Sequence, residues 1–265
     1  MPDYALLDKQ AMLRDYLFYP RRDSTPPPAG AFDIMVPVEK GKDEPVVACR
    51  FFLENADWPW ILYFHGNGEV AADYNQLCRL YHQIETNLVV ADYRGYGLSS
   101  GQPGFQYLIQ DAHVIYRTVR NEIKQRNYSQ QLWLMGRSLG STSALELASH
   151  YQDHLQGLII ESGFASITRL VTQWGLPADH IQMEMVEEQC LEMLHGITMP
   201  ALIIHGERDS LVYPQEGKLI FDNLGNSEKS LEMIPGAGHN DIIVADIQRY
   251  FGSIRKFMQE TASSK

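Results

Sequence analysis

The chain alternates between short apolar runs and longer stretches in which apolar residues recur at helical spacing. Short runs that are apolar at nearly every position are typical of strands in a sheet that helices cover on both faces. The pattern therefore predicts an α/β fold with a mostly parallel eight-stranded sheet flanked by helices, in a single domain over residues 1–265. The strands are expected at 31–36, 46–53, 60–64, 88–91, 132–135, 158–160, 201–204 and 231–234, with the first two forming an antiparallel edge.

The segment 165–200 is longer than a plain crossover between two strands requires. It contains Trp174 and, within a helical pattern, Met183 and Met185. Tryptophan and methionine suit a wall that adapts to varied apolar groups. We therefore predict a small helical cap at 165–200, with Trp174, Met183 and Met185 lining a substrate pocket. The alternative is a pair of amphipathic helices packed on the sheet, because apolar residues at helical spacing are usually core.

The strand predicted at 132–135 runs into Gly136-Arg137-Ser138-Leu139-Gly140, and a helical pattern follows at once. Flanking glycines allow a serine to occupy a strained turn between strand and helix, because they place no Cβ in the crowded corner. Such a turn exposes the serine Oγ and directs the free amides of the helix N-terminus at any oxyanion beside it. The motif predicts that Ser138 is a nucleophile.

A second glycine-rich turn, His65-Gly66-Asn67-Gly68, follows the strand predicted at 60–64. A turn in this position can present a backbone amide to a reacting carbonyl oxygen. We predict an oxyanion hole formed by the amides of Asn67 and Leu139, with Gly68 as the second choice. The alternative is an ordinary turn in which His65 only braces the loop.

Two further strands end in loops that carry an acid and a base. Asp209 follows the strand at 201–204, and His239 follows the strand at 231–234. Asp209 would orient His239, which would take the proton from Ser138 and return it to the leaving group. The chain order Ser, Asp, His is that of the α/β-hydrolase arrangement. Glu161, at the end of another predicted strand, is the alternative acid.

These segments resemble those of the α/β-hydrolases, and most of all the branch that contains Bem46-like proteins and the mammalian α/β-hydrolase domain-containing proteins 12, 13 and 17. The resemblance implies the α/β-hydrolase fold and a serine hydrolase mechanism with Ser138, Asp209 and His239 as the catalytic triad. Members of this branch are often tied to membranes by an N-terminal transmembrane helix or palmitoylated cysteines. Neither pattern is visible here, so we expect no transmembrane anchor. The resemblance rests on residues 64–69, 92–99, 136–141, 161–164, 204–209 and 236–241.

Other polar residues near these motifs are expected to be structural. We predict that Asp92 and Arg94 pair with each other, and that Arg137 forms a salt bridge with a neighbouring loop. Asp111 and His113 lie two positions apart on a predicted helix, so they face different directions and make a poor metal site.

The composition is that of an acidic globular protein. A formal charge of −11 and a pI near 5.2 argue against a nucleic-acid or anionic-membrane partner, because such binding depends on basic patches. The three cysteines have no Cys-x-x-Cys spacing, which favours a reducing, cytoplasmic location and no structural zinc. The nine histidines lack the His-Glu-x-x-His spacing, and no Gly-x-Gly-x-x-Gly follows a strand, so we expect no metal and no cofactor.

The most direct functional prediction is a serine hydrolase that cleaves an ester or thioester through an acyl-enzyme, with water as the second substrate. Its expected partner is a small-molecule or lipid-like acyl substrate, and nothing in the sequence specifies an oligomeric state. A serine aminopeptidase or amidase is the first alternative, in which Glu184, Glu187 or Glu188 would hold the substrate amine. A non-catalytic α/β-hydrolase scaffold is the second, and an intact triad argues against it.

Overall fold

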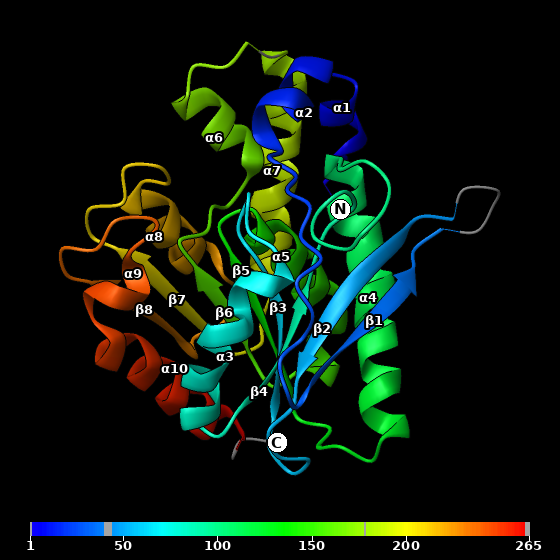
Figure 1. The fold of residues 1–265 in the computed structure, drawn as a ribbon. Helices are drawn as coiled ribbons and strands as arrows, with labels where there is room; N and C mark the ends of the chain where they lie inside the picture. Colours follow the sequence, from blue (N-terminus) through cyan, green and yellow to red (C-terminus); the bar gives the residue numbers. More distant parts are fainter. Residues whose placement is uncertain (1, 40–43, 178, 263–265) are drawn as a thin grey trace.

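The computed structural model describes residues 2–39, 44–177 and 179–262. The ends of the predicted 1–265 domain and residue 178 of the predicted cap lie outside the described residues. Within them the chain forms an eight-stranded sheet in the order β1-β2-β4-β3-β5-β6-β7-β8 (Figure 1). Strand β2 is antiparallel to both its neighbours and the other strand pairs are parallel, which confirms the predicted sheet and its antiparallel edge. The strands are β1 (Ala31–Pro37), β2 (Val46–Phe52), β3 (Trp60–Phe64), β4 (Asn87–Ala91), β5 (Leu132–Arg137), β6 (Leu158–Glu161), β7 (Ala201–Gly206) and β8 (Lys229–Ile234).

Helices cover both faces of the sheet, and strand β3 shows why. Its residues Trp60, Leu62 and Phe64 belong to one core cluster, shared with α4 (Phe105–Gln125), α5 (Gly140–Tyr151) and α8 (Pro214–Asn223). The intervening Ile61 and Tyr63 belong to a second cluster, shared with α3 (Tyr74–Gln83) and α10 (Ile247–Ala262). Because side chains alternate across a strand, a strand buried on both faces must be apolar throughout. Three short helical elements complete the connections: η1 (Ala71–Asp73), η2 (Gln152–His154) and α9 (Ile242–Ala245).

Two helices occupy the segment between β6 and β7, namely α6 (Ile167–Gln173) and α7 (His180–Gly196). Helices α1 (Ala5–Asp8) and α2 (Ala11–Leu17), from the other end of the chain, lie beside them at the top of Figure 1. Helix α1 packs on α7 and α4, and the Asp8 carboxylate accepts hydrogen bonds from the backbone amides of Phe105 and Gln106 at the start of α4 (both 2.8 Å). The upper helical layer is therefore built from two distant parts of the sequence, of which the hydrophobic pattern identified only one.

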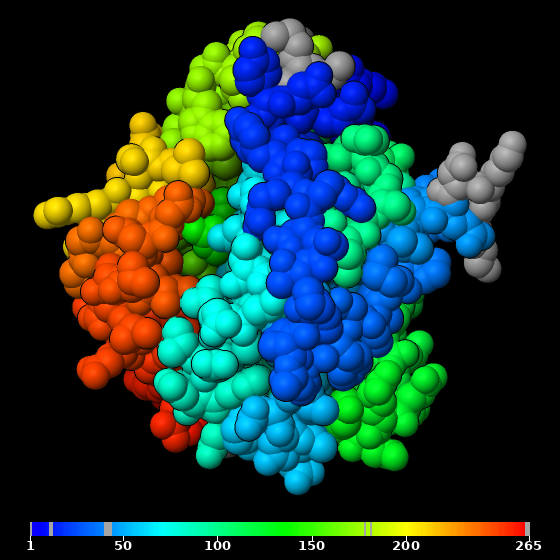
Figure 2. All heavy atoms as spheres, in the orientation of Figure 1, coloured from blue at the N-terminus to red at the C-terminus, as the bar shows by residue number. Residues whose placement is uncertain are grey.

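Residues 18–30, which we call the N-terminal strap, run from this layer across the surface of the molecule, as the dark blue atoms in Figure 2 show. The strap is bonded to the loop after β4, where the Gly97 amide donates to the Arg21 carbonyl (2.8 Å) and the Asp23 amide donates to the Gly97 carbonyl (3.3 Å). Within the described ranges, no helix combines the length and apolar character needed to cross a bilayer.

Candidate active site

Ser138 lies in the turn between β5 and α5, with a backbone φ of +49°. This left-handed conformation is costly for a residue with a side chain, and the neighbouring backbone holds it in place. The Ser138 amide donates to the Glu161 carbonyl on the adjacent strand (2.9 Å). A Cβ added at Gly136 would lie 2.5 Å from the Gly140 carbonyl oxygen, and one at Gly140 would collide with the Phe64 carbonyl. Both glycines are therefore required by close backbone approach.

The structure brings Ser138, His239 and Asp209 together from three separate loops at the carboxyl end of the sheet. The Nε2 of His239 lies 3.1 Å from the Oγ of Ser138, and its Nδ1 lies 2.7 Å from the Oδ2 of Asp209. All three residues are less than a tenth exposed. In this geometry the imidazole can accept the serine proton while the carboxylate sets the tautomer and orientation of the ring.

Asp209 is held as a carboxylate by its surroundings. Its Oδ1 accepts hydrogen bonds from the amides of Leu211 (3.0 Å) and Val212 (2.8 Å), and its Oδ2 lies 3.4 Å from the Nε2 of His205. Burial by itself would raise the pKa of the Asp209 carboxyl. The hydrogen bonds from His205 and His239, and the charge of His239 when protonated, outweigh burial and bring that pKa well below its ordinary value.

Glu161, the alternative acid, is committed to other partners. Its Oε1 accepts from the Nε of Arg137 (3.0 Å), and its Oε2 accepts from the hydroxyls of Tyr63 (3.2 Å) and Tyr250 (2.6 Å). Both carboxylate oxygens of Glu161 are therefore hydrogen-bonded to these residues, and neither oxygen is bonded to His239. The geometry therefore favours Asp209 as the partner of the histidine.

Arg137, next to the serine, links the loops that surround it. One guanidinium nitrogen, Nη1, pairs with Glu69 (2.6 Å), which is the ion pair with a neighbouring loop that the sequence predicted. The other, Nη2, donates to the carbonyl of His239 (2.8 Å) and to the side chain of Asn240 (3.0 Å). Burial lowers the pKa of Arg137, but Glu69 and Glu161 more than offset this and leave the pKa above its ordinary value. The side chain is therefore a buried cation held between two carboxylates.

The turn after β3 lies beside the serine and is tied to the rest of the site through side chains. The Oε2 of Glu69 accepts from the Gly66 amide (2.7 Å), while the Asn67 side chain accepts from the Tyr19 amide (3.0 Å) and donates to the Leu17 carbonyl (2.8 Å). Within the described residues, the backbone amides of Asn67, Gly68 and Leu139 donate to no other group of the protein. These three N–H groups are therefore available to donate hydrogen bonds to a ligand.

A pocket of about 410 Å³ opens beside Ser138. Trp174 is part of its wall, but Met183 and Met185 are not. Met183 is buried in the core, whereas Met185 is exposed to solvent. Residues two apart on a helix point in different directions, so the two methionines of α7 do not share one wall. The pocket is lined by Tyr19, Asn67, Arg137, Ser138, Trp174, Leu211, His239 and Asn240.

Two of the apolar wall residues, Tyr19 and Leu211, were not identified from the sequence. Tyr19 belongs to the N-terminal strap, and Leu211 belongs to the loop that carries Asp209. Neither lies in a helix or strand, so no hydrophobic periodicity marks it. The only local signal for Leu211 is its position two residues after the predicted acid.

The predicted ion pair between Asp92 and Arg94 is not formed. Asp92 instead accepts hydrogen bonds from the Ala71 amide (2.8 Å) and faces the Nε2 of His65 (3.2 Å), whereas Arg94 pairs with Asp111 (2.7 Å). The other ring nitrogen of His65, Nδ1, lies 2.8 Å from the Gly66 carbonyl, so this side chain links the turn after β3 to Asp92.

A family model described as serine aminopeptidase, S33, matches residues 59–182 and 180–243. Protein L404 of Acanthamoeba polyphaga mimivirus is 31% identical over 212 residues, which are 77% of this chain and 75% of L404. Bem46 of Schizosaccharomyces pombe is 27% identical over 208 residues, covering 76% of this chain and 68% of Bem46. The α/β-hydrolase domain-containing protein 17C of Xenopus tropicalis is 26% identical over 245 residues, covering 78% of this chain and 75% of that protein.

Solved structures show the same fold at lower sequence identity. The esterase Pf2001 of Pyrococcus furiosus superposes with a TM-score of 0.71 at 15% identity, covering 92% of this chain and 97% of that chain. The family match extends over the turn that carries Ser138 and the loops that carry Asp209 and His239. The chain therefore belongs to the serine aminopeptidase S33 family of α/β-hydrolases, in the branch that includes Bem46 and the 17C proteins.

Proposed function

We propose that the protein is a serine hydrolase that cleaves carboxylic esters, or the chemically similar thioesters, through an acyl-enzyme. The observation that carries the proposal is the continuous hydrogen-bonded chain from Ser138 through His239 to Asp209 at the edge of a pocket. The esterase named among the structural neighbours has the same fold and supports the same class of reaction.

In the proposed reaction, Ser138 Oγ attacks the acyl carbonyl while Nε2 of His239 takes its proton. The carbonyl oxygen becomes an oxyanion, and the amides of Asn67 and Leu139 are the proposed donors to it, with Gly68 as the second choice in the same turn. The imidazolium then protonates the departing alkoxide or thiolate, which leaves an acyl group on Ser138. Water, deprotonated by His239, attacks this acyl-enzyme and releases the acid.

The pocket wall supports an ester substrate over an amine-bearing one. Apolar surface comes from Tyr19, Trp174 and Leu211, and none of the residues that line this pocket in the described chain is an aspartate or glutamate. An aminopeptidase needs a carboxylate for the substrate ammonium group. Glu187, one of the predicted candidates, is instead paired with Arg169 (2.6 Å).

The two other candidates for an amine site, Glu184 and Glu188, are exposed on α7 and lie outside the pocket lining. We therefore propose an uncharged acyl substrate whose apolar part rests against the Tyr19, Trp174 and Leu211 wall. A pocket of this size is suited to a small acyl or aromatic group, since ligand sites of this class span about 300–1,000 Å³.

The test is a series of p-nitrophenyl esters from acetate to palmitate, with matched acyl thioesters and aminoacyl anilides, alongside labelling by a fluorophosphonate probe. Wild type is expected to label and to turn over esters with an optimum in chain length. Ser138→Ala is expected to lose labelling and to reduce turnover by about 10³-fold or more while keeping the fold. Turnover of the anilides alone would replace the proposal with the amidase alternative. Absence of labelling would favour the scaffold.

A further inference from the structure

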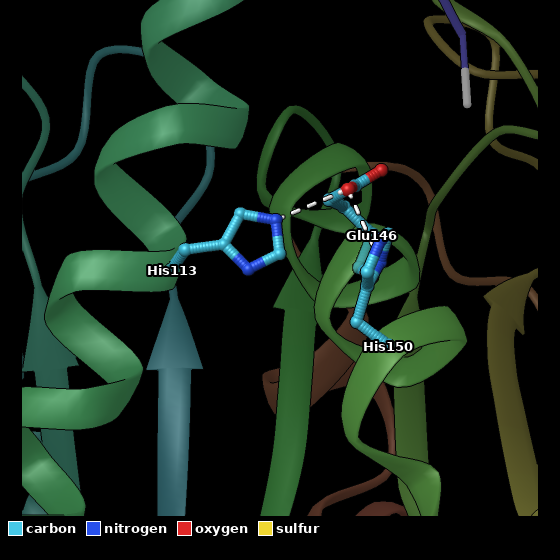
Figure 3. A group of neighbouring side chains, drawn as sticks. All are labelled: His113, Glu146 and His150. Atoms are coloured by element: carbon cyan, nitrogen blue, oxygen red, sulfur yellow. Dashed lines mark hydrogen bonds and ion pairs between the residues drawn. The ribbon is translucent and has the colours of Figure 1, made fainter.

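A cluster of potential metal ligands lies away from the triad, between α4 and α5. Glu146 and His150 project from α5 toward His113 on α4 (Figure 3). The Nε2 of His113 lies 3.2 Å from the Oε1 of Glu146, and the Nδ1 of His150 lies 3.3 Å from the same oxygen. One ligand atom from each of the three residues falls within 4.8 Å of the others. The cluster thus places two imidazole nitrogens beside one carboxylate oxygen, and the Nδ1 of His150 also lies 3.0 Å from the main-chain carbonyl of Glu146 and 3.0 Å from the hydroxyl of Ser149.

The Glu146 carboxylate is buried without adequate compensation. Glu146 is 1% exposed, and its Oε2 has no hydrogen-bond partner among the described residues. The ion pairs of this carboxylate in the described chain are with the two histidines and with no lysine or arginine. A buried carboxylate that has an oxygen without a hydrogen bond lowers the stability of the fold unless a cation balances its charge. A bound cation would balance the charge of Glu146 and would also provide a partner for its Oε2.

The spacing and outer contacts of the ligands fit a transition-metal ion. Bond lengths of about 2.0–2.1 Å to nitrogen and oxygen in tetrahedral geometry place neighbouring ligand atoms about 3.3 Å apart. The two histidine nitrogens lie at this spacing from Oε1 of Glu146 (3.2 and 3.3 Å), and the three ligand atoms all lie within 4.8 Å of one another. The second ring nitrogen of His113, Nδ1, lies 3.1 Å from the hydroxyl of Tyr151. A metal-bound histidine commonly has such a partner on its other nitrogen, which orients the ring.

We propose that His113, Glu146 and His150 form a binding site for a divalent transition-metal ion of the zinc class. The mixed imidazole and carboxylate donors suit zinc better than the oxygen-preferring calcium and magnesium. The side chain of His150 is 35% exposed, which gives the ion a route from solvent and leaves room for a water ligand. Sequence spacing predicted no metal, because the three ligands come from two helices and match no short motif.

The site is structural in character. Helix α5 begins directly after the nucleophile turn, and Glu146 lies eight residues beyond Ser138, about 12 Å along a helix axis. A metal bound there would join α4 to α5 and would contact none of Ser138, His239 or Asp209. Its effect is therefore expected on thermal stability rather than on the chemical step, and the proposal does not depend on the proposed reaction.

The test is calorimetric titration of chelator-treated protein with Zn²⁺, with the absorption spectrum of bound Co²⁺ and the thermal midpoint as independent measurements. One ion per chain is expected, with a rise of about 5–10 °C in the midpoint at a free Zn²⁺ concentration about 100 times the dissociation constant. His150→Ala, at the exposed edge of the cluster, should weaken binding by at least tenfold and remove most of the midpoint rise. His113→Ala should do the same.

His195→Ala is the matched control, because His195 is an exposed histidine that contacts Asn223 outside the cluster. It should bind Zn²⁺ as wild type does. Glu146→Gln is the stricter variant, and if it fails to fold, the two histidine variants decide the question. No binding to wild type would overturn the proposal. Binding that both His113→Ala and His150→Ala retain would show adventitious association with other surface histidines and would also overturn it.

Discussion

The guanidinium of Arg137 donates to the main-chain oxygen of His239 at 2.8 Å, and so joins the residue before the serine to the loop that carries the histidine. The same side chain pairs with Glu69, whose other oxygen binds the Gly66 amide in the turn after β3. The three loops around Ser138 are therefore joined through one buried cation. Because catalysis requires reacting atoms to be held to within a fraction of an ångström, we expect Arg137 to act as a positioning residue for the proposed reaction.

Replacing Arg137 by methionine should lower kcat by about 10- to 100-fold with a smaller change in KM, because misplaced donors and base act on the transition state more than on substrate binding. It should also lower the free energy of unfolding by about 3–5 kcal/mol, since Glu69 and Glu161 lose their shared counter-ion. Steady-state kinetics and urea unfolding measure the two effects. Arg126→Met, which removes an exposed i,i+4 pair, is the control. Wild-type kcat in Arg137→Met would exclude the positioning role.

Asp209→Asn should reduce turnover by about 10⁴-fold, because an amide favours the wrong tautomer of His239. Glu161→Gln should have a much smaller effect on turnover and act mainly through the contacts of Glu161 with Arg137, Tyr63 and Tyr250. The measurement is ester hydrolysis by the two variants at equal folded concentration. If Glu161→Gln is the more damaging of the two, the acid must be reassigned.

The low pKa of the Asp209 carboxyl makes a prediction about acid stability. A carboxyl whose pKa is lower in the folded state than in the unfolded chain stabilises the fold above its unfolded value, about 3.9, and loses that contribution as the pH falls through its folded pKa. The difference in unfolding free energy between wild type and Asp209→Asn should therefore shrink as the pH falls below about 4. Urea unfolding at pH 7, 5, 4 and 3 tests this. A difference that does not change with pH would mean that the carboxyl titrates alike in both states.

Trp174→Ala should reduce kcat/KM for preferred esters by about 5- to 30-fold, as expected for losing one to two kcal/mol of apolar contact with the acyl group. Tyr19→Ala should behave similarly, because Tyr19 forms another part of the same wall. Fluorophosphonate labelling of Ser138 should persist in both variants. Met185→Ala is the matched control, since this exposed methionine lies outside the pocket, and its kinetics should equal those of wild type. A loss in Met185→Ala as large as in Trp174→Ala would place the substrate elsewhere.

The sequence by itself determined the sheet and the positions of the candidate catalytic residues along it. The strands at Trp60–Phe64 and Leu132–Arg137 are apolar at nearly every position because both of their faces are buried. This pattern can be recognised within each short segment of the sequence. The glycines around Ser138 are also a local signal, because backbone crowding near this one turn leaves no space for a Cβ at their positions. Parallel strands with right-handed crossovers then bring their carboxyl ends to one edge of the sheet.

Only the tertiary structure decided which distant residues meet there. Tyr19 lines the pocket because the N-terminal strap is bonded to Asn67, and Met183 does not because α7 turns it into the core. Glu161 follows a strand just as Asp209 does, yet it is neutralised by Arg137 instead of facing His239. His113 and Glu146 meet across two helices that are separate in sequence. Such contacts depend on the packing of whole elements, and periodicity within one segment carries no information about its partner.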